Sequence, residues 1–192
     1  MNHYWQKIIS WIMVTAFFLC PPVFCEMMSE QDSEKQYYGT GELKFERQVK
    51  KGKPDGPARE YYKNGVIKKE LQYIDGKLEG PFLAYYDNGK IWLQGAYEND
   101  RLSGELKEYY VSGELQGKRF YKNNMLYNQC NFYYKNGTLL AEIMYLDNSR
   151  DGTCRVYDKA GNLRLEKIYQ YGKKIGERKY DPQGKLISKE SL

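Results

Sequence analysis

The residues whose types could support catalysis or metal binding are few, and their spacing does not bring them together. The single histidine of the 192-residue chain, His3, lies in a segment that we interpret below as a cleaved leader. Without histidine, Ser-His-Asp triads, histidine metal sites and imidazole pH switches are excluded. The glutamates are spread among lysines, whereas a glycosidase needs two facing acids in a cleft. We therefore expect a protein that is not an enzyme and that binds no cofactor and no metal.

Two cysteines fall in the part of the sequence that is repeated. Cys130 and Cys154 occupy the same position of neighbouring repeats. Two strand spacings would then separate their Cα atoms by about 10 Å, whereas a disulfide needs these atoms within about 7 Å. We predict two small buried hydrophobic side chains, without a disulfide and without a zinc site.

Composition and charge exclude two further classes of protein. Tyrosine is abundant, with 20 residues, whereas the mature chain lacks the runs of Val, Ile and Leu that fill the buried strands of a doubly wound α/β enzyme. The net charge of +5 at pH 7 is mild and dispersed. A nucleic-acid-binding protein typically concentrates Lys and Arg in a stripe, so we expect no nucleic-acid partner.

The first 25 residues have the layout of a secretory signal peptide. One basic residue, Lys7, precedes an apolar run at residues 8–19, and two prolines follow it. The run is shorter than the roughly 20 residues that cross a bilayer as a helix. We predict cleavage after Cys25 and export to the periplasm, the outer envelope or the medium; a retained membrane anchor is the alternative. Residues 26–36 are polar and predict a flexible linker.

A 24-residue repeat organises the rest of the chain. With Gly56 as position 1, units start near residues 32, 56, 80, 104, 128 and 152, and a partial unit starts at 176. Sixteen of the 20 tyrosines fall in this frame. The repeat domain would span residues 37–187, with a C-terminal tail at 188–192. The recurring residues are Tyr61, Tyr85, Tyr109, Tyr133 and Tyr157 at position 6; Gly41, Gly65, Gly89, Gly113, Gly137 and Gly161 at position 10; and Tyr73, Tyr97, Tyr121, Tyr145 and Tyr169 at position 18.

Each unit is predicted to form two antiparallel strands. Asn-Gly and similar pairs at positions 9–10 favour a two-residue type I′ hairpin turn, which needs positive φ at both central residues. Asp, Asn and Gly at positions 20–21 favour a second turn. The sequence therefore predicts an all-β protein, an elongated single-layer antiparallel meander of β-hairpin repeats that twists or curls.

Two-residue turns would also fix which side chains share a face. They would pair position 7 with 12, 5 with 14, and 16 with position 1 of the next unit. The core face would then carry the tyrosines of positions 7 and 18 and the Ile or Leu of position 12. The glycines of position 10 would be structural turn residues, and the tyrosines of position 18 structural core.

The tyrosines of position 6 would lie on the opposite face. Together with Trp92 they form a candidate binding ladder, since flat rings at intervals of about 10 Å suit extended peptides, glycans or lipid head groups. The alternative is that these rings only shield the sheet and stabilise cross-strand pairs.

The repeat resembles the MORN-repeat variant found in bacterial proteins of the YwqK-type antitoxin family. The resemblance covers residues 37–187 and rests on Tyr61-Tyr62, Asn64-Gly65, Ile67, Tyr73, Gly76 and Leu78 and their equivalents in later units. It implies an array of β-hairpins that binds another macromolecule, with a toxin as one candidate partner.

We therefore expect an exported, non-enzymatic module for protein–protein interaction, with an antitoxin-like or immunity-like role implied by the resemblance. Two alternatives are glycan binding at the cell wall and association with a membrane surface. Because a long single sheet buries little surface, face-to-face pairing into a homodimer is a further expectation.

Overall fold

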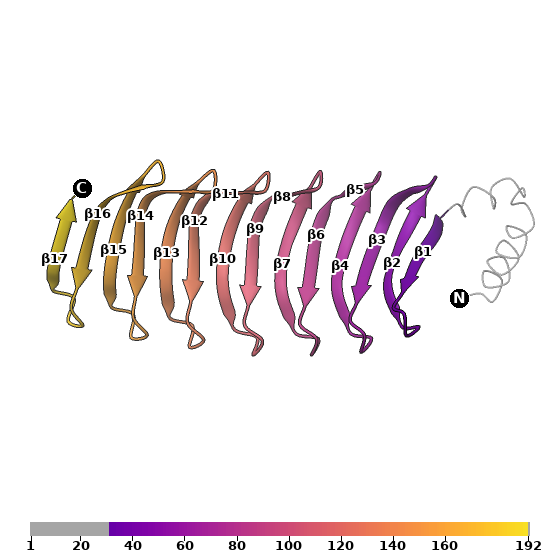
Figure 1. The fold of residues 1–192 in the computed structure, drawn as a ribbon, viewed down its shortest axis with the longest axis horizontal. Helices are drawn as coiled ribbons and strands as arrows, with labels where there is room; N and C mark the ends of the chain where they lie inside the picture. Colours follow the sequence, from indigo (N-terminus) through magenta and orange to yellow (C-terminus); the bar gives the residue numbers. More distant parts are fainter. Residues whose placement is uncertain (1–30, 192) are drawn as a thin grey trace, which may run out of the picture.

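The structure, a computed structural model, describes residues 31–191 as one antiparallel sheet of 17 strands that does not close (Figure 1). The predicted signal peptide and residues 26–30 of the predicted linker lie outside the described residues. The strands are β1 (Gln31–Tyr37), β2 (Leu43–Lys50), β3 (Lys53–Tyr61), β4 (Ile67–Ile74), β5 (Lys77–Leu78), β6 (Gly80–Tyr85), β7 (Ile91–Glu98), β8 (Arg101–Leu102), β9 (Gly104–Tyr109), β10 (Leu115–Lys122), β11 (Met125–Leu126), β12 (Asn128–Tyr133), β13 (Leu139–Leu146), β14 (Ser149–Tyr157), β15 (Leu163–Gln170), β16 (Lys173–Tyr180) and β17 (Leu186–Ser191).

Strands that follow one another in the chain lie side by side, in a single row with β1 and β17 at its two ends (Figure 1). The short strands β5, β8 and β11 lead into β6, β9 and β12, which continue the pairing with the preceding long strand. Residues 31–191 contain no helix that is long and apolar enough to cross a membrane. The predicted all-β meander of hairpin repeats is confirmed.

The turns at positions 20–21 have the predicted form. Both central residues have positive φ in each unit, as in Asp75 (49°) and Gly76 (87°). This is what a two-residue type I′ turn requires. Asn, Asp and Gly recur there because their backbones reach this region at least cost.

The turns at positions 9–10 differ from the prediction. All six predicted turn glycines have positive φ, between 80° and 111°, but the residue before each of them does not. In the first full unit the Gly65 amide donates to the Tyr62 carbonyl, which closes a turn around Lys63 and Asn64. The loop is therefore a type I turn followed by a left-handed glycine. The Asn64 side chain accepts a hydrogen bond from the Val66 amide, which explains asparagine without a positive φ.

A bulge beside this loop moves position 12 to the other face. Glu60 pairs with Lys69 as predicted, but Tyr61 rather than Tyr62 pairs with Ile67. Residues directly opposite each other share a face, so the Ile and Leu of position 12 lie with the tyrosines of position 6. The prediction that position 12 belongs to the core is wrong, because the bulge places one extra residue in the strand.

A second bulge joins one unit to the next. Tyr73 pairs with Leu78 across the turn, whereas Glu70 pairs with Leu83, so two residues of the later strand are extra. The predicted pairing of position 16 with position 1 of the next unit is therefore wrong. Because the shift is two residues, every side chain keeps its face. In the units that begin at residues 56 to 152, position 1 lies in this bulge with positive φ, and Asn128 (69°) replaces the usual glycine there.

One face of the sheet holds nearly all the buried side chains, and we call it the packed face. Its buried hydrophobic residues are Val49, Ala58, Phe82, Ala84, Leu106, Cys130, Ala141 and Cys154. Most of them are small, because larger neighbours on the same face must cover them without a second layer. The position 18 tyrosines, predicted as core, line this face and are half-buried.

The two repeat cysteines are free and buried, as predicted. Ile143 lies directly opposite both Cys130 and Cys154, on the strand between them. Burial raises the pKa of both thiols.

Two predicted boundaries need correction. Residues 31–36, assigned to the flexible linker, belong to β1 and pair with β2. One polar side chain of this segment, Glu34, forms an ion pair of 2.7 Å with Arg47 directly opposite. Residues 188–191, assigned to the tail, belong to β17 and pair with β16.

Candidate functional site

The face opposite the packed face carries Tyr61, Tyr85, Tyr109, Tyr133 and Tyr157, and we call it the tyrosine face. Three of these tyrosines are fixed by glutamates that lie 15 residues earlier in the chain. Their hydroxyls donate to Glu46 at 2.6 Å, Glu70 at 2.7 Å and Glu142 at 2.8 Å, from Tyr61, Tyr85 and Tyr157 respectively. These three rings therefore have set orientations in the unbound protein.

A row of directly opposite residues crosses the tyrosine face beside these rings, and we call it the central row. Its members, in order along the sheet, are Lys35, Glu46, Arg59, Glu70, Leu83, Gln94, Lys107, Lys118, Asn131, Glu142, Arg155, Glu166 and Arg178.

Opposite charges alternate at both ends of the central row. Arg59 lies between Glu46 at 3.8 Å and Glu70 at 3.3 Å. At the other end Arg155 and Arg178 contact Glu166, at 3.3 and 2.6 Å. Glu166 is only 8% exposed, and these two guanidiniums compensate its charge.

Burial and the hydrogen bonds to glutamates keep the hydroxyls of Tyr61, Tyr85 and Tyr157 protonated. Burial, and then the hydrogen bond donated to Glu70, raise the pKa of Tyr85 to about 12. The same two causes raise the pKa of Tyr61 and of Tyr157. An ionised phenol would lose its donor and face a carboxylate.

We predict that alkaline pH weakens the fold through these tyrosines. Because the pKa of Tyr85 in the fold lies above its ordinary value of 10.0, its stabilising contribution is complete below that pH and is lost as pH rises toward about 12. The free energy of unfolding, measured in urea at a series of alkaline pH values, should fall. The slope should be shallower in Tyr85→Phe, and an equal slope in the variant would contradict the assignment.

The structure separates Trp92 from the candidate ladder. Tyr85 pairs with Ile91 and Ala84 with Leu93, so Trp92 is the extra residue of the bulge. Its ring centroid lies 6.0 Å from that of Tyr86, and its indole N–H is 3.4 Å from Glu108 Oε1. Trp92 therefore does not continue the row of position 6 tyrosines, and a sequence register without the bulge could not show this.

The tyrosines of position 7 bind neighbouring loops together instead of filling the core. Each hydroxyl donates to the carbonyl of position 6 in the next unit, at 2.7 to 2.9 Å. The five donors are Tyr38, Tyr62, Tyr86, Tyr110 and Tyr134. The prediction that position 7 is core is wrong, because the three-residue loop carries it beyond the paired strands. The recurring Tyr-Tyr pair was the signal for this contact.

A second repeated contact lies at the other end of the strands, at the turns of positions 20–21, and the sequence did not predict it. In three units the residue at position 21 accepts a backbone N–H through its side-chain oxygen and donates its own N–H to the carbonyl of the same partner. The pairs are Asp100 with Leu78, Asn124 with Leu102, and Asn148 with Leu126.

Two shallow depressions on the tyrosine face meet at Pro57, and we call them the proline trough. The first is lined by polar residues of β1 to β3, among them Lys35, Glu46 and Arg59. The second is mostly apolar and is lined by Pro57, Pro81 and Leu83 with Gln72 and Glu70. The carbonyl of Gln72, which lies opposite Pro57, accepts a hydrogen bond from the Glu79 amide, so it does not need the N–H that Pro81 lacks.

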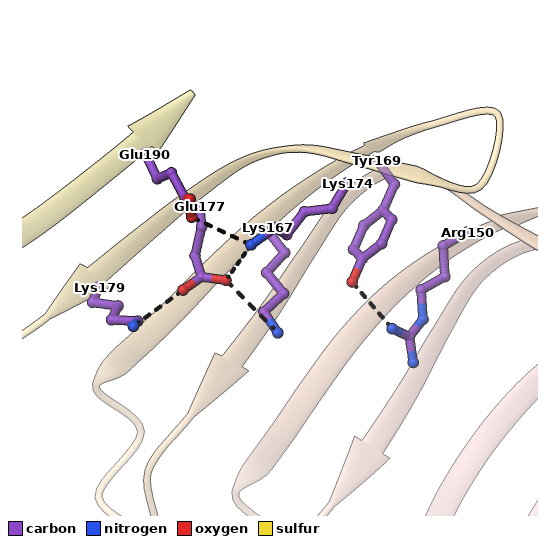
Figure 2. Close-up of polar contacts among 7 residues, drawn as sticks. All are labelled: Arg150, Lys167, Tyr169, Lys174, Glu177, Lys179 and Glu190. Carbon is purple, nitrogen blue, oxygen red and sulfur yellow. Dashed lines mark hydrogen bonds and ion pairs between the residues drawn. The ribbon is translucent and has the colours of Figure 1, made fainter. Parts of the chain in front are cut away.

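A group of lysines on the packed face shares one carboxylate (Figure 2). Glu177 contacts Lys174 at 3.2 Å, Lys179 at 3.2 Å and Lys167 at 3.8 Å, and Lys174 also reaches Glu190 at 3.3 Å. These hydrogen bonds, first from Lys174 and then from Lys179, lower the pKa of Glu177. Within residues 31–191 no group of three His, Cys, Asp or Glu side chains could hold a metal ion.

Comparison with known proteins supports the repeat. The family model described as the MORN repeat variant matches residues 54–75, 78–99, 102–123 and 128–147. These four segments contain successive hairpins of the central part of the sheet. No curated protein matches the chain.

Proposed function

We propose that this chain, whose four central repeats match the MORN repeat variant, is a non-enzymatic module that binds a protein partner through its tyrosine face. MORN repeats are in general modules for interaction with proteins or membranes. The observation that carries the proposal is the row of position 6 rings on one face beside the proline trough, in which hydrogen bonds to glutamates orient Tyr61, Tyr85 and Tyr157. Side chains already fixed in the unbound state lose little conformational entropy when a partner binds.

A protein partner is favoured by the mixture of chemistry on this face. The proline trough offers an apolar surface around Pro57 and Pro81, and charged residues of the central row border it. Protein interfaces combine an apolar centre with a polar rim, and tyrosine is enriched in them.

The test compares capture of proteins by the full chain and by Tyr109→Ala/Tyr133→Ala. These two tyrosines lack the glutamate bonds of the others, so their removal should leave the fold intact. Tyr171→Ala removes a ring that is 81% exposed at a turn and is the matched control. Proteins held by the wild type and the control should be lost from the double variant.

Equal capture by all three proteins would contradict the proposal. Retention on purified cell wall that requires the same two tyrosines would replace it with glycan binding, and vesicle binding at low salt would replace it with membrane association.

We also propose that the protein is exported and acts outside the cytoplasm. In an antitoxin-like or immunity-like role, it would bind its toxin there. Residues 1–25 support this through their signal-peptide layout. N-terminal sequencing of the protein from its native envelope should begin at Glu26. A chain that still begins at Met1 would contradict cleavage.

A further inference from the structure

The alternating charges of the central row stop in its middle. Between Glu70 and Glu142 the row consists of Leu83, Gln94, Lys107, Lys118 and Asn131, so five successive strands supply no carboxylate to it. Lys107 and Lys118 lie directly opposite each other on β9 and β10. Like charges in this arrangement destabilise a sheet. The middle of the row therefore lacks the anion that both of its ends contain.

The groups around this gap lack partners that their equivalents have. Lys107 contacts Glu105 at 3.1 Å. Within residues 31–191, however, the Lys118 ammonium has neither an ion pair nor a hydrogen bond. The Tyr133 hydroxyl, 15 residues after Lys118, likewise has no hydrogen-bond partner among the described residues. In three other units this spacing leads from a tyrosine to a glutamate, as from Tyr157 to Glu142, and in a fourth it leads from Tyr109 to Gln94.

Lysines on the packed face show that one carboxylate of this sheet can pair with several ammonium groups. On the packed face one carboxylate, Glu177, serves three lysines (Figure 2). Lys107 and Lys118 have no such shared group in the row.

From this arrangement we propose that Lys107, Lys118 and Tyr133 form a subsite for a carboxylate side chain of an acidic peptide segment in the protein partner. The subsite rests on the proposed function and specifies the partner. The incoming carboxylate would accept hydrogen bonds from both ammonium groups and from the tyrosine hydroxyl. Such charge-assisted bonds are stronger than neutral ones. The partner would thus complete the row with the same kind of group that Glu142 and Glu166 provide.

The neighbouring proline trough adds a second requirement on the peptide. Leu83 belongs both to the central row and to the apolar part of the trough. Three strand spacings separate Leu83 from Lys118, which is about 14 Å, and an extended peptide covers this distance in about four residues. The preferred segment therefore has an apolar residue about four positions from Asp or Glu residues.

The first test titrates the isotope-labelled full chain with a synthetic peptide that carries one leucine and, four residues away, two aspartates. Amide NMR shifts should change at Lys107, Lys118 and Tyr133, and Lys107→Glu/Lys118→Glu should weaken the affinity at least about tenfold. The matched control, Lys159→Glu/Lys185→Glu, makes the same change of net charge in exposed loops and should bind as the wild type does. A peptide with asparagine at both aspartate positions should bind the wild type as weakly as the aspartate peptide binds Lys107→Glu/Lys118→Glu.

A second measurement separates binding from folding. Lys118→Glu places a carboxylate opposite Lys107 and 15 residues before Tyr133, as Glu142 is placed before Tyr157. The unfolding midpoint of the free protein should therefore rise, while peptide binding should be lost. A lower midpoint, or peptide binding equal to that of the wild type, would overturn the subsite. Equal shifts with inorganic phosphate or with anionic vesicles would also overturn it, in favour of a general anion site or a membrane contact.

The two proposals can fail separately. If capture of the partner needs Tyr109 and Tyr133 but not Lys107 and Lys118, the subsite is wrong and the tyrosine face remains the binding surface. If capture needs neither pair, the proposed function itself is wrong.

Discussion

Cys130→Asp is expected to destabilise the sheet by about 3 kcal/mol, because it places an uncompensated charge in the packed face. The Cys130 side chain is 0% exposed and is the largest fully buried one among the described residues. Its surroundings already disfavour charge, since burial raises the pKa of the thiol. Ile143 lies directly opposite and offers no polar group to an aspartate, and the nearby Arg119 guanidinium is already paired with Glu108 at 2.6 Å. Urea unfolding at neutral pH, followed by circular dichroism, measures the loss.

Cys130→Ala is the control for this variant. It removes the sulfur without adding charge, so a smaller loss of about 1 kcal/mol is expected from the small cavity. If the aspartate variant proved as stable as the alanine variant, the side chain at this position would have access to water, and the assignment of the packed face would be wrong.

Gly95→Ala should destabilise the protein by about 1–3 kcal/mol through overpacking. A Cβ atom at Gly95 would lie 2.8 Å from the Leu106 side chain and 2.8 Å from the Phe82 ring. Both neighbours are buried, and the Phe82 ring packs against Tyr97 with centroids 4.9 Å apart. Neither can move without opening a contact elsewhere. Thermal and urea unfolding give the change.

Gly39→Ala is the matched substitution for comparison. A Cβ there would have no atom within 4 Å, and the φ of Gly39 is not positive. Its replacement should leave stability unchanged or slightly higher, because alanine restricts the unfolded chain. An equal loss of unfolding free energy in the two variants would show that the close contacts around Gly95 do not cause the destabilisation.

The 24-residue period was sufficient to predict the fold class and the order of the strands. It also gave the turns at positions 20–21, where residues such as Asp75 and Gly76 favour left-handed backbone. The Asn-Gly turns were mispredicted because the same dipeptide fits two loop geometries. The Asn64 side chain bonds the Val66 amide and so stabilises a type I turn, a preference that composition alone does not reveal.

The candidate site was predictable in part. The face of the position 6 tyrosines followed from the period of two along a strand. The pairing of Lys107 with Lys118 followed from the predicted register, in which position 5 pairs with 14. The contacts between units were not predictable, because they depend on bulges whose extra residues leave no clear mark in the sequence. Trp92 was misplaced for this reason, and the tyrosine bonds to Glu46, Glu70 and Glu142 were missed.

The sheet has two open edges, and each strand pairs only with its neighbours along the row. The length of the sheet can therefore change by whole units. One unit contributes two strand spacings, so duplicating or losing a unit changes the length by about 10 Å. Since 24 is an even number, the units on either side would still present their rings in the same direction. Duplication of a unit within the gene would therefore increase the distance between two contact sites on this face. The side chains that make each contact would stay the same.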